Sequence, residues 1–483
     1  MQQKSIARNI FYKVTLNFFN LVLPLIVGPY VYRTLGASSI GMVSYAETIF
    51  NYFLIFAVFG VHQYGLRELS RVKNDPEKVS KLFTSLFTVA MVASLTAAAM
   101  FYGIAYFGFG DDKMFPVLLI FGLSLIVNTF YVDWVNEALE NYDFITIKTI
   151  IVKLTYVALL FALVHNSNDY KQFAFLLMLT TFLNNIISFF YIKRKVKFNF
   201  EGLTIREHIR PLIVVVIFSN ANILYTQLDR LMLGKFVNTA AVSFYVMANQ
   251  IMAIINTLIL SVIQVTIPRL SYLSGNDDDD SYINLLNTIS KVYFAALFPA
   301  AMGLFIISDL GVVIYGGKEF AAAGVVLAVF SFYMVSVGIE SILANQIIYV
   351  KKRENTLVKL IFIAGIVNFG LNIALLKLKL FTPATAIFTT ALANYLLISL
   401  EYIFIRKYIK VKYNLFEFSK LKYFLYSLLF IPISYGIRLF VTDTIYLFLT
   451  LVIVNAGVYA AILFITKDEV LYMFLDRILK RKK

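Results

Sequence analysis

Apolar runs of twenty or more residues recur along the whole of this 483-residue chain. Each is long enough to cross a bilayer core of about 30 Å as a helix that rises about 1.5 Å per residue. Backbone polar groups in lipid must be satisfied within the spanning element, so these runs predict helices. A β-barrel would need shorter segments of strict apolar and polar alternation, which the sequence lacks. We therefore predict an all-α integral membrane protein with no soluble domain in this chain.

The hydropathy predicts about fourteen transmembrane helices, an even number. The predicted spans cover residues 10–32, 40–65, 82–107, 116–136, 144–165, 173–192, 211–233, 240–266, 290–314, 321–349, 357–378, 383–405, 423–440 and 445–466.

Basic residues indicate the orientation of these spans. If the N-terminus is cytoplasmic, 31 Lys and Arg residues fall in inner segments and 7 in outer ones. This bias is what the positive-inside rule predicts, and one missed or extra span would destroy it. The sequence therefore predicts that both termini are cytoplasmic. The net charge of +15 then reflects topology, and we do not expect nucleic acid as a partner.

Several kinds of chemistry are disfavoured by the residues present. The chain has no cysteine and only three histidines, which are far apart, so we expect no metal site. It also lacks a phosphate-binding GxxxxGK[ST] loop, so we expect neither ATP hydrolysis nor another cofactor. The outer loops are short and leave little room for a catalytic site. We therefore expect a transporter rather than an enzyme, with its function inside the helix bundle.

A weak internal repeat suggests two lobes. Leu35-Gly36 followed by Val43-Ser44-Tyr45 resembles Leu233-Gly234 followed by Val242-Ser243-Phe244-Tyr245, six predicted spans later. A parallel repeat of this kind predicts two pseudo-symmetric six-helix lobes with a substrate path between them. The predicted organisation is an N-terminal lobe at 1–195, a C-terminal lobe at 205–410, two extra transmembrane helices at 420–466 and a basic cytoplasmic tail at 467–483.

Polar residues inside the predicted spans form stripes along single helix faces. Because a charge in the bilayer centre costs about 2.5–3.5 kcal/mol on insertion scales, such residues are candidates for lining a hydrophilic cavity. A single Asn is more simply explained by hydrogen bonding between helices, and a Lys near a helix end can reach the headgroups. The stripes are Lys13, Asn17 and Asn20; Ser44, Glu47 and Asn51; Asn249, Asn256 and Gln264; with Lys153 deep in the fifth span, Glu340 and Asn345 in the tenth, and Asn368 and Asn372 in the eleventh.

Five short segments, in order along the chain, resemble the polysaccharide or O-antigen (Wzx-like) flippase family, within the superfamily of multidrug, oligosaccharidyl-lipid and polysaccharide exporters. They are Leu35-Gly36 through Gly41 with Ser44-Tyr45, Gly60 through Glu68, Asp133-Trp134 with Leu139-Glu140 and residues 145–148, Tyr225 through Asp229 with Leu233-Gly234, and Pro268-Arg269-Leu270-Ser271. One departure is that Asn136, Glu137 and Ala138 follow Trp134, where the family usually has a Gln-Gly pair.

The resemblance implies a flippase of the bacterial cytoplasmic membrane that moves undecaprenyl-diphosphate-linked oligosaccharides to the outer leaflet by alternating access. Membrane lipids would surround it, and a polysaccharide polymerase with its chain-length machinery could be a partner. Cations suit a diphosphate and amides suit sugar hydroxyls. We therefore expect Lys13, Lys153, Arg67 and Arg269 near the diphosphate, and Asn17, Asn20, Asn51, Asn249 and Asn256 near the sugars.

Three rival functions remain open. A cation-coupled multidrug exporter of the same superfamily would use Glu47, Asp133 or Asp229 to bind Na⁺ or H⁺. A peptidoglycan-precursor flippase would carry a related lipid-linked cargo. A membrane glycosyltransferase is disfavoured by the short outer loops.

Overall fold

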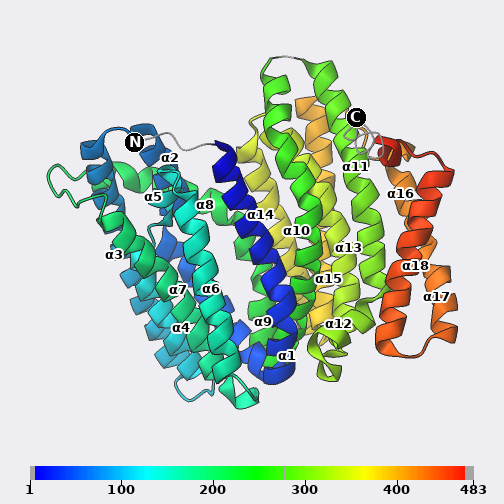
Figure 1. Cartoon of the computed structure of the whole chain (residues 1–483), viewed down its shortest axis with the longest axis horizontal. Helices are drawn as coiled ribbons and strands as arrows, with labels where there is room; N and C mark the ends of the chain where they lie inside the picture. The colour runs from blue at the N-terminus through cyan, green and yellow to red at the C-terminus, as the bar shows by residue number, and fades with distance from the viewer. Residues whose placement is uncertain (1–5, 277, 474–483) are drawn as a thin grey trace. The chain divides into compact units, whose positions relative to one another are not determined.

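The computed structural model describes residues 6–276 and 278–473, and all regular secondary structure in these ranges is helical (Figure 1). The chain divides into two compact units, Met1–Ser243 and Phe244–Lys483. The predicted lobe limits, 1–195 and 205–410, and the separate pair at 420–466 remain predictions. Residues 474–483 of the predicted tail lie outside the described part.

The first unit is built from long helices joined by short turns. Its elements are α1 (Ile6–Val58), α2 (Val61–Val72), α3 (Pro76–Phe109), α4 (Phe115–Val127), η1 (Asn128–Phe130), α5 (Asp133–Ala138), α6 (Tyr142–Leu163), η2 (Ser167–Asp169), α7 (Tyr170–Lys193), α8 (Ile205–Thr226), α9 (Leu228–Phe236) and the start of α10 (Thr239–Gly275).

The second unit contains most of α10 and all later elements. These are α11 (Asp279–Ile306), α12 (Ser308–Gly316), η3 (Lys318–Phe320), α13 (Ala323–Ser341), the π-helical η4 (Ile342–Tyr349), α14 (Glu354–Lys377), α15 (Pro383–Phe404), the π-helical η5 (Ile405–Ile409), α16 (Phe418–Leu428), α17 (Phe430–Phe440) and α18 (Thr444–Ile465).

Helix α1 contains the first two predicted spans and a break between them. Its 53 residues are too many for one crossing, since a straight helix of that length would measure about 80 Å. Gly36 interrupts the helix with φ 73° and ψ 171°, a conformation that a side chain would oppose. The second predicted span, 40–65, is not one continuous helix, because Phe59 and Gly60 have positive φ and α2 begins at Val61.

Twelve helical stretches among the described residues are long and apolar enough to cross a membrane. One of them, Phe11–Val72, includes both predicted spans of α1. The predicted span at 211–233 is not among the twelve. The chain there divides into α8, which carries Arg206, Glu207 and Arg210 in its first two turns, and α9, which has only nine residues. The all-α membrane architecture is thus confirmed at this coarser level.

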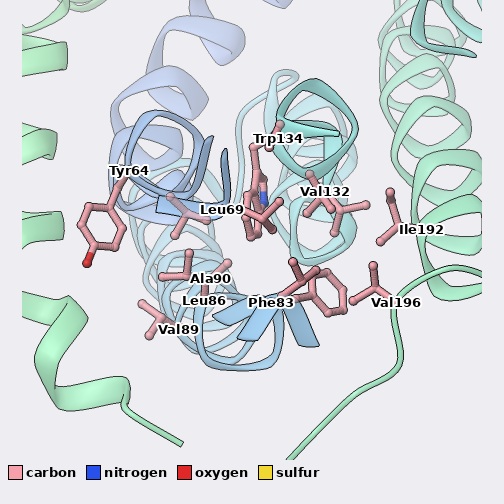
Figure 2. Close-up of a cluster of buried hydrophobic side chains, with 14 of the residues drawn as sticks. Tyr64, Leu69, Phe83, Leu86, Val89, Ala90, Val132, Trp134, Ile192 and Val196 are labelled. Atoms are coloured by element: carbon pink, nitrogen blue, oxygen red, sulfur yellow. The ribbon is translucent and has the colours of Figure 1, made fainter. Parts of the chain in front are cut away.

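A buried aromatic cluster forms part of the core of the first unit (Figure 2). Trp134 is 1% exposed and its ring centroid lies 6.4 Å from that of Phe83, which stacks on Phe198. A Cβ atom at Gly65 would lie 2.6 Å from the indole, so only glycine lets α2 approach this closely. Packing against α2 and α3 therefore buries Trp134 in the core of this unit.

Asparagines in the second unit join neighbouring helices. Asn368 of α14 donates a hydrogen bond of 2.9 Å to Thr390 of α15, and Asn372 accepts one of 2.5 Å from Thr389. All four residues are buried. For these two asparagines the structure favours hydrogen bonding between helices over a role in lining a cavity.

The contact between α2 and α8 depends on a histidine that should respond to pH. Tyr64 and His208 Nδ1 are 2.8 Å apart, and Thr204 lies 3.2 Å from the other ring nitrogen. Burial lowers the pKa of His208 from its ordinary value of 6.5, although Glu207 and Glu68 oppose the shift. Because the folded state favours the neutral ring, its stabilising contribution is present above pH 6.5 and is lost as the pH falls through the lower, folded-state pKa.

We expect hydrogen–deuterium exchange of α2 and of residues 205–210, corrected for intrinsic rates, to be faster at about pH 5 than at about pH 7.5. His208→Phe should remove this difference because the ring no longer titrates. His165→Phe, at an exposed turn, is the matched control and should leave it in place. Equal corrected exchange at both pH values in the unmodified protein would contradict the assignment.

Candidate functional site

Polar and charged residues are linked where α1, α6 and α9 pack together in the first unit. We call this set the α1–α6–α9 cluster; its members are Asn20, Glu47, Tyr52, Lys153, Tyr156, Asp229 and Arg230. They come from three segments far apart in sequence. Each is costly in a membrane-spanning bundle unless it has a polar partner or a ligand.

Lys153 is the cation of this cluster on α6. It lies eleven residues after the start of the helix at Tyr142, which places it in the middle of the span. Its Nζ donates a hydrogen bond of 2.6 Å to the side-chain oxygen of Asn20 on α1. The described residues place no carboxylate within ion-pair distance of this ammonium. An anionic ligand could therefore supply the counter-charge that the described residues do not provide for Lys153.

Glu47 connects α1 to both of the other helices. It is half-buried, and its charge interacts with Arg230 of α9 and with Tyr156 of α6. The Nε atom of Arg230 is buried and has no hydrogen-bond partner in the described part of the chain. Tyr156 lies one helical turn after Lys153 and therefore on the same face of α6. The cluster thus contains two cations, Lys153 and Arg230, and two acids, Glu47 and Asp229.

Asp229 lies in the first turn of α9 and is fully buried. Its charge interacts with Tyr52 of α1. A helix N-terminus favours a negative side chain, which stabilises the carboxylate in this position. Asp229 therefore helps to hold α9 against α1 and to set the position of the neighbouring Arg230.

Two glycines allow α9 and the start of α10 to lie close to α1. A Cβ atom at Gly234 would lie 2.3 Å from the ring of Tyr45, and one at Gly41 would lie 1.8 Å from the backbone oxygen of Thr239. Neither position can hold a larger residue without displacing a helix. Gly41 and Gly234 belong to the two similar segments from which the internal repeat was inferred, so these segments pack against each other.

The remaining predicted ligand residues are not all brought together. In the first unit, Lys13 lies 5.8 Å from the ring centre of Tyr142, and Arg67 pairs with the adjacent Glu68 at 2.8 Å. Asn17 is exposed and Asn51 is half-buried.

Helix α10 carries the other predicted ligands. Asn249 is half-buried, and Asn256 is 8% exposed with an oxygen that has no partner among the described residues. Arg269 is exposed near the end of the helix.

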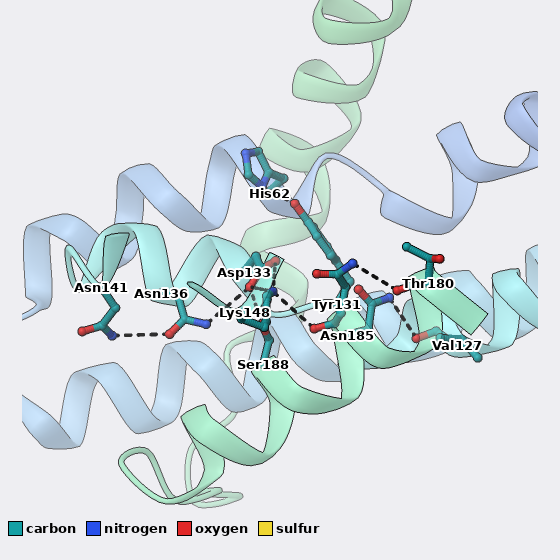
Figure 3. A network of polar contacts seen from close by, with 11 residues as sticks. His62, Val127, Tyr131, Asp133, Asn136, Asn141, Lys148, Thr180, Asn185 and Ser188 are labelled. Carbon is teal, nitrogen blue, oxygen red and sulfur yellow. Dashed lines mark hydrogen bonds and ion pairs between the residues drawn. The ribbon is translucent and has the colours of Figure 1, made fainter. Parts of the chain in front are cut away.

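Asp133 belongs to a separate buried network (Figure 3). Both of its carboxylate oxygens accept hydrogen bonds from Lys148 Nζ, at 3.0 and 2.8 Å, and Ser188 donates another at 2.5 Å. Lys148 is 4% exposed and also lies 2.7 Å from Ser188. The network joins α5, α6 and α7, so Asp133 already has a protein cation.

The sequence did not single out Tyr156 or assign a role to Arg230. Tyr156 is one of 31 tyrosines and belongs to no obvious stripe. Arg230 follows Asp229 directly, and neighbouring side chains on a helix point in different directions. Only the packing of α1 against α6 and α9 connects them. The spacing of residues along the chain does not link Tyr156 to Arg230.

Comparison with known proteins identifies the family. The family described as "Polysaccharide biosynthesis protein" matches residues 6–274, which is more than half of the chain. The chain belongs to this family, and it is a multi-pass bacterial membrane protein.

Two relatives of this chain are named as transporters. A protein of Shigella dysenteriae named "Putative O-antigen transporter" is 22% identical over 369 residues, covering 75% of this chain and 90% of that protein. A protein of the same name from Escherichia coli strain K12 is 20% identical over 407 residues, covering 83% and 97%. These relatives carry the names of transporters, not of enzymes.

The fold resembles that of a solved flippase. The structure of lipid II flippase MurJ in its inward closed conformation matches with a TM-score of 0.74 and 19% identity. The match covers 97% of this chain and 100% of that one.

Proposed function

We propose that this protein is a flippase that moves an undecaprenyl-diphosphate-linked oligosaccharide from the inner to the outer leaflet for the assembly of surface polysaccharide. The observation that carries the proposal is Lys153, a cation in the middle of α6 whose hydrogen bond in the structure is to the amide of Asn20. A diphosphate supplies the charge that this ammonium lacks, and an amide can also bind sugar hydroxyls. Family membership and the transporter relatives support the same cargo class.

Among the predicted ligands, Lys153 is the strongest candidate for the diphosphate and Asn20 for the first sugar. Arg230, to which the sequence assigned no role, is a further candidate for the diphosphate. Lys13, Arg67 and Arg269 would act nearer the cytoplasmic surface, where they can attract the anionic headgroup. Further sugar contacts would come from the remaining predicted amides, Asn17, Asn51, Asn249 and Asn256.

Among the predicted coupling acids, Glu47 is the strongest candidate in the first unit. It is half-buried beside Arg230, so a proton or cation on its carboxylate would alter the charge that a diphosphate meets. Asp133 is a weaker candidate because Lys148 already neutralises it. Asp229 would act mainly through the position of Arg230.

We further propose fourteen spans with both termini in the cytoplasm of the bacterial inner membrane. The twelve candidate stretches become fourteen if Phe11–Val72 crosses twice, on either side of Gly36, and α8 with α9 crosses once. Alternating access between two lobes and a polymerase as a downstream partner complete the proposal. Removal of the product by such a partner would help to draw the cargo outward.

Deletion of the gene in its own organism tests the cargo class. We expect cells to lose surface polysaccharide, to accumulate the lipid-linked oligosaccharide on the cytoplasmic side, and to continue growing. Arrest of growth with accumulation of peptidoglycan precursor would instead identify a precursor flippase. Unchanged surface polysaccharide with loss of drug resistance would favour the multidrug exporter.

A further inference from the structure

The second unit contains a pair of carboxyl groups, the half-buried Glu340 on α13 and the buried Glu401 on α15. Glu401 is fully buried, and neither of its side-chain oxygens has a hydrogen-bond partner among the described residues. Its charge interacts with that of Glu340. A lone buried carboxylate costs several kcal/mol or more, and a second one nearby adds repulsion. Something must neutralise this pair.

Helix geometry explains why the two glutamates face each other. Helices α13 and α15 run in the same direction because only α14 separates them in the chain, and the two helices pack together. Asn394 donates a hydrogen bond of 3.0 Å to Ser336 across their interface. Glu340 lies four residues after Ser336, and Glu401 lies seven after Asn394. Both spacings stay on the same helix face, so the carboxyl groups follow this hydrogen bond along the same interface.

A tyrosine from a third helix points into the same place. The hydroxyl of Tyr293 on α11 is buried and has no hydrogen-bond partner within the described ranges. It lies 3.1 Å from where a Cβ atom on Gly338 would be, two residues before Glu340, and it interacts electrostatically with Glu340. Polar groups from three helices therefore converge here. Two of them, Glu401 and Tyr293, have hydrogen-bonding capacity that the described residues leave unused.

Both glutamate helices change geometry just beyond the pair. The π-helical η4 begins two residues after Glu340, and η5 begins four residues after Glu401. These two segments also pack against each other. Wide helical turns are uncommon and often accompany functional sites. The carboxyl pair thus lies beside a place where the packing of α13 and α15 departs from regular helix.

No cation of the protein neutralises the pair in the part of the chain that the structure describes. On α12, which packs against α13, Asp309 is paired with Arg438 at 2.8 Å. On α14, which packs against α15, Lys359 is exposed. On α11, Lys291 is paired with Glu469 at 2.9 Å. Tyr293 is the group of that helix that interacts with Glu340. The described residues contain no group of three or more His, Cys, Asp or Glu side chains able to hold a metal ion.

We propose that Glu340 and Glu401 form a proton-binding site, with Tyr293 as the third polar group. A proton between the two carboxyl groups removes their repulsion and needs no further ligands, whereas a hard cation needs six or more oxygens. The site does not depend on the proposed cargo. If the protein is a flippase, uptake of this proton on one side of the membrane and its release on the other would couple transport to a proton gradient, which a chain without an ATP-binding loop could use.

Infrared difference spectroscopy of the purified protein in lipid vesicles tests the proposal. Between about pH 5 and about pH 9 we expect a carbonyl band from a protonated, buried carboxyl group that shifts in D₂O. Glu340→Gln/Glu401→Gln should remove the band entirely. Glu201→Gln, at an exposed position, should leave it unchanged. Gln closely matches a protonated Glu in shape, and the single variants serve if the double variant does not fold.

Absence of this band in the unmodified protein, or its persistence in every folded variant, would overturn the proposal. So would a band that disappears on adding Na⁺ in sodium-free buffer, since that identifies a cation site. The measurement uses no cargo. A band that behaves as expected in a protein that does not move lipid-linked oligosaccharide would leave the proton site standing and reject the flippase function.

Discussion

Lys153→Ala should reduce translocation of a lipid-linked oligosaccharide in proteoliposomes by about ten- to a hundredfold, because a hydrogen bond to a charged group contributes about 1.5–3 kcal/mol. The substitution removes the cation that contacts Asn20 at 2.6 Å in the middle of α6. Lys153→Arg keeps the charge and should retain most of the activity. The amount of protein in the membrane should not change, since Lys153 has no ion pair in the described structure to lose.

Asn20→Asp tests whether transport needs the unneutralised charge of Lys153. It places a carboxylate beside the ammonium with almost no change in shape, so the protein itself then neutralises Lys153. We expect this variant to fold and to lose transport nearly as severely as Lys153→Ala. Lys171→Ala, an exposed lysine on α7, is the control and should transport normally. Normal polysaccharide export by cells carrying Lys153→Ala would refute the role of this residue.

Lys148→Met should destabilise the protein by about 3 kcal/mol or more, because breaking a buried pair leaves an uncompensated charge. The Lys148 side chain is 2% exposed and contacts both carboxylate oxygens of Asp133, whose side chain is 19% exposed. The free energy of unfolding in detergent measures the effect. A matched Lys171→Met substitution at an exposed position should change it by about 0.5 kcal/mol or less.

The double variant Asp133→Asn/Lys148→Met separates loss of the pair from the cost of a stranded carboxylate. Because neither partner is then charged, we expect it to recover most of the stability that Lys148→Met loses. Transport by a stable double variant would also show that Asp133 does not bind the coupling ion. A double variant that is less stable than Lys148→Met would contradict this account of the network.

The architecture could be predicted because membrane insertion imposes a strong pattern. Long apolar runs and the distribution of Lys and Arg predicted an all-helical, multi-pass protein, and the all-helical structure and the family confirm it. Local breaks were harder to place. The turn at Phe59 and Gly60 lies within an apolar stretch. A tryptophan near the end of a predicted span, such as Trp134, is typical of an interfacial anchor. Only tertiary packing shows that the first ends a helix and the second is buried.

The candidate site was only partly accessible from sequence. Spacing of three and four residues shows which side chains share a helix face, and so it grouped Asn17 with Asn20 and Glu47 with Asn51. It cannot show which faces meet. Three pairs join different helices: Lys153 with Asn20, Lys148 with Asp133, and Glu401 with Glu340. From the sequence alone, Glu401 is only an acidic residue near the basic inner end of its predicted span.

Translocation by the purified protein is the most direct test of the central claim. The protein would be reconstituted into vesicles that contain an undecaprenyl-diphosphate-linked oligosaccharide with a fluorescent label on the sugar, and a membrane-impermeant quencher would report sugars that reach the outer surface. We predict that quenching proceeds beyond the half expected for static lipid, and that this further quenching is about ten- to a hundredfold slower in Lys153→Ala vesicles. Equal quenching in vesicles with and without the protein would contradict the account.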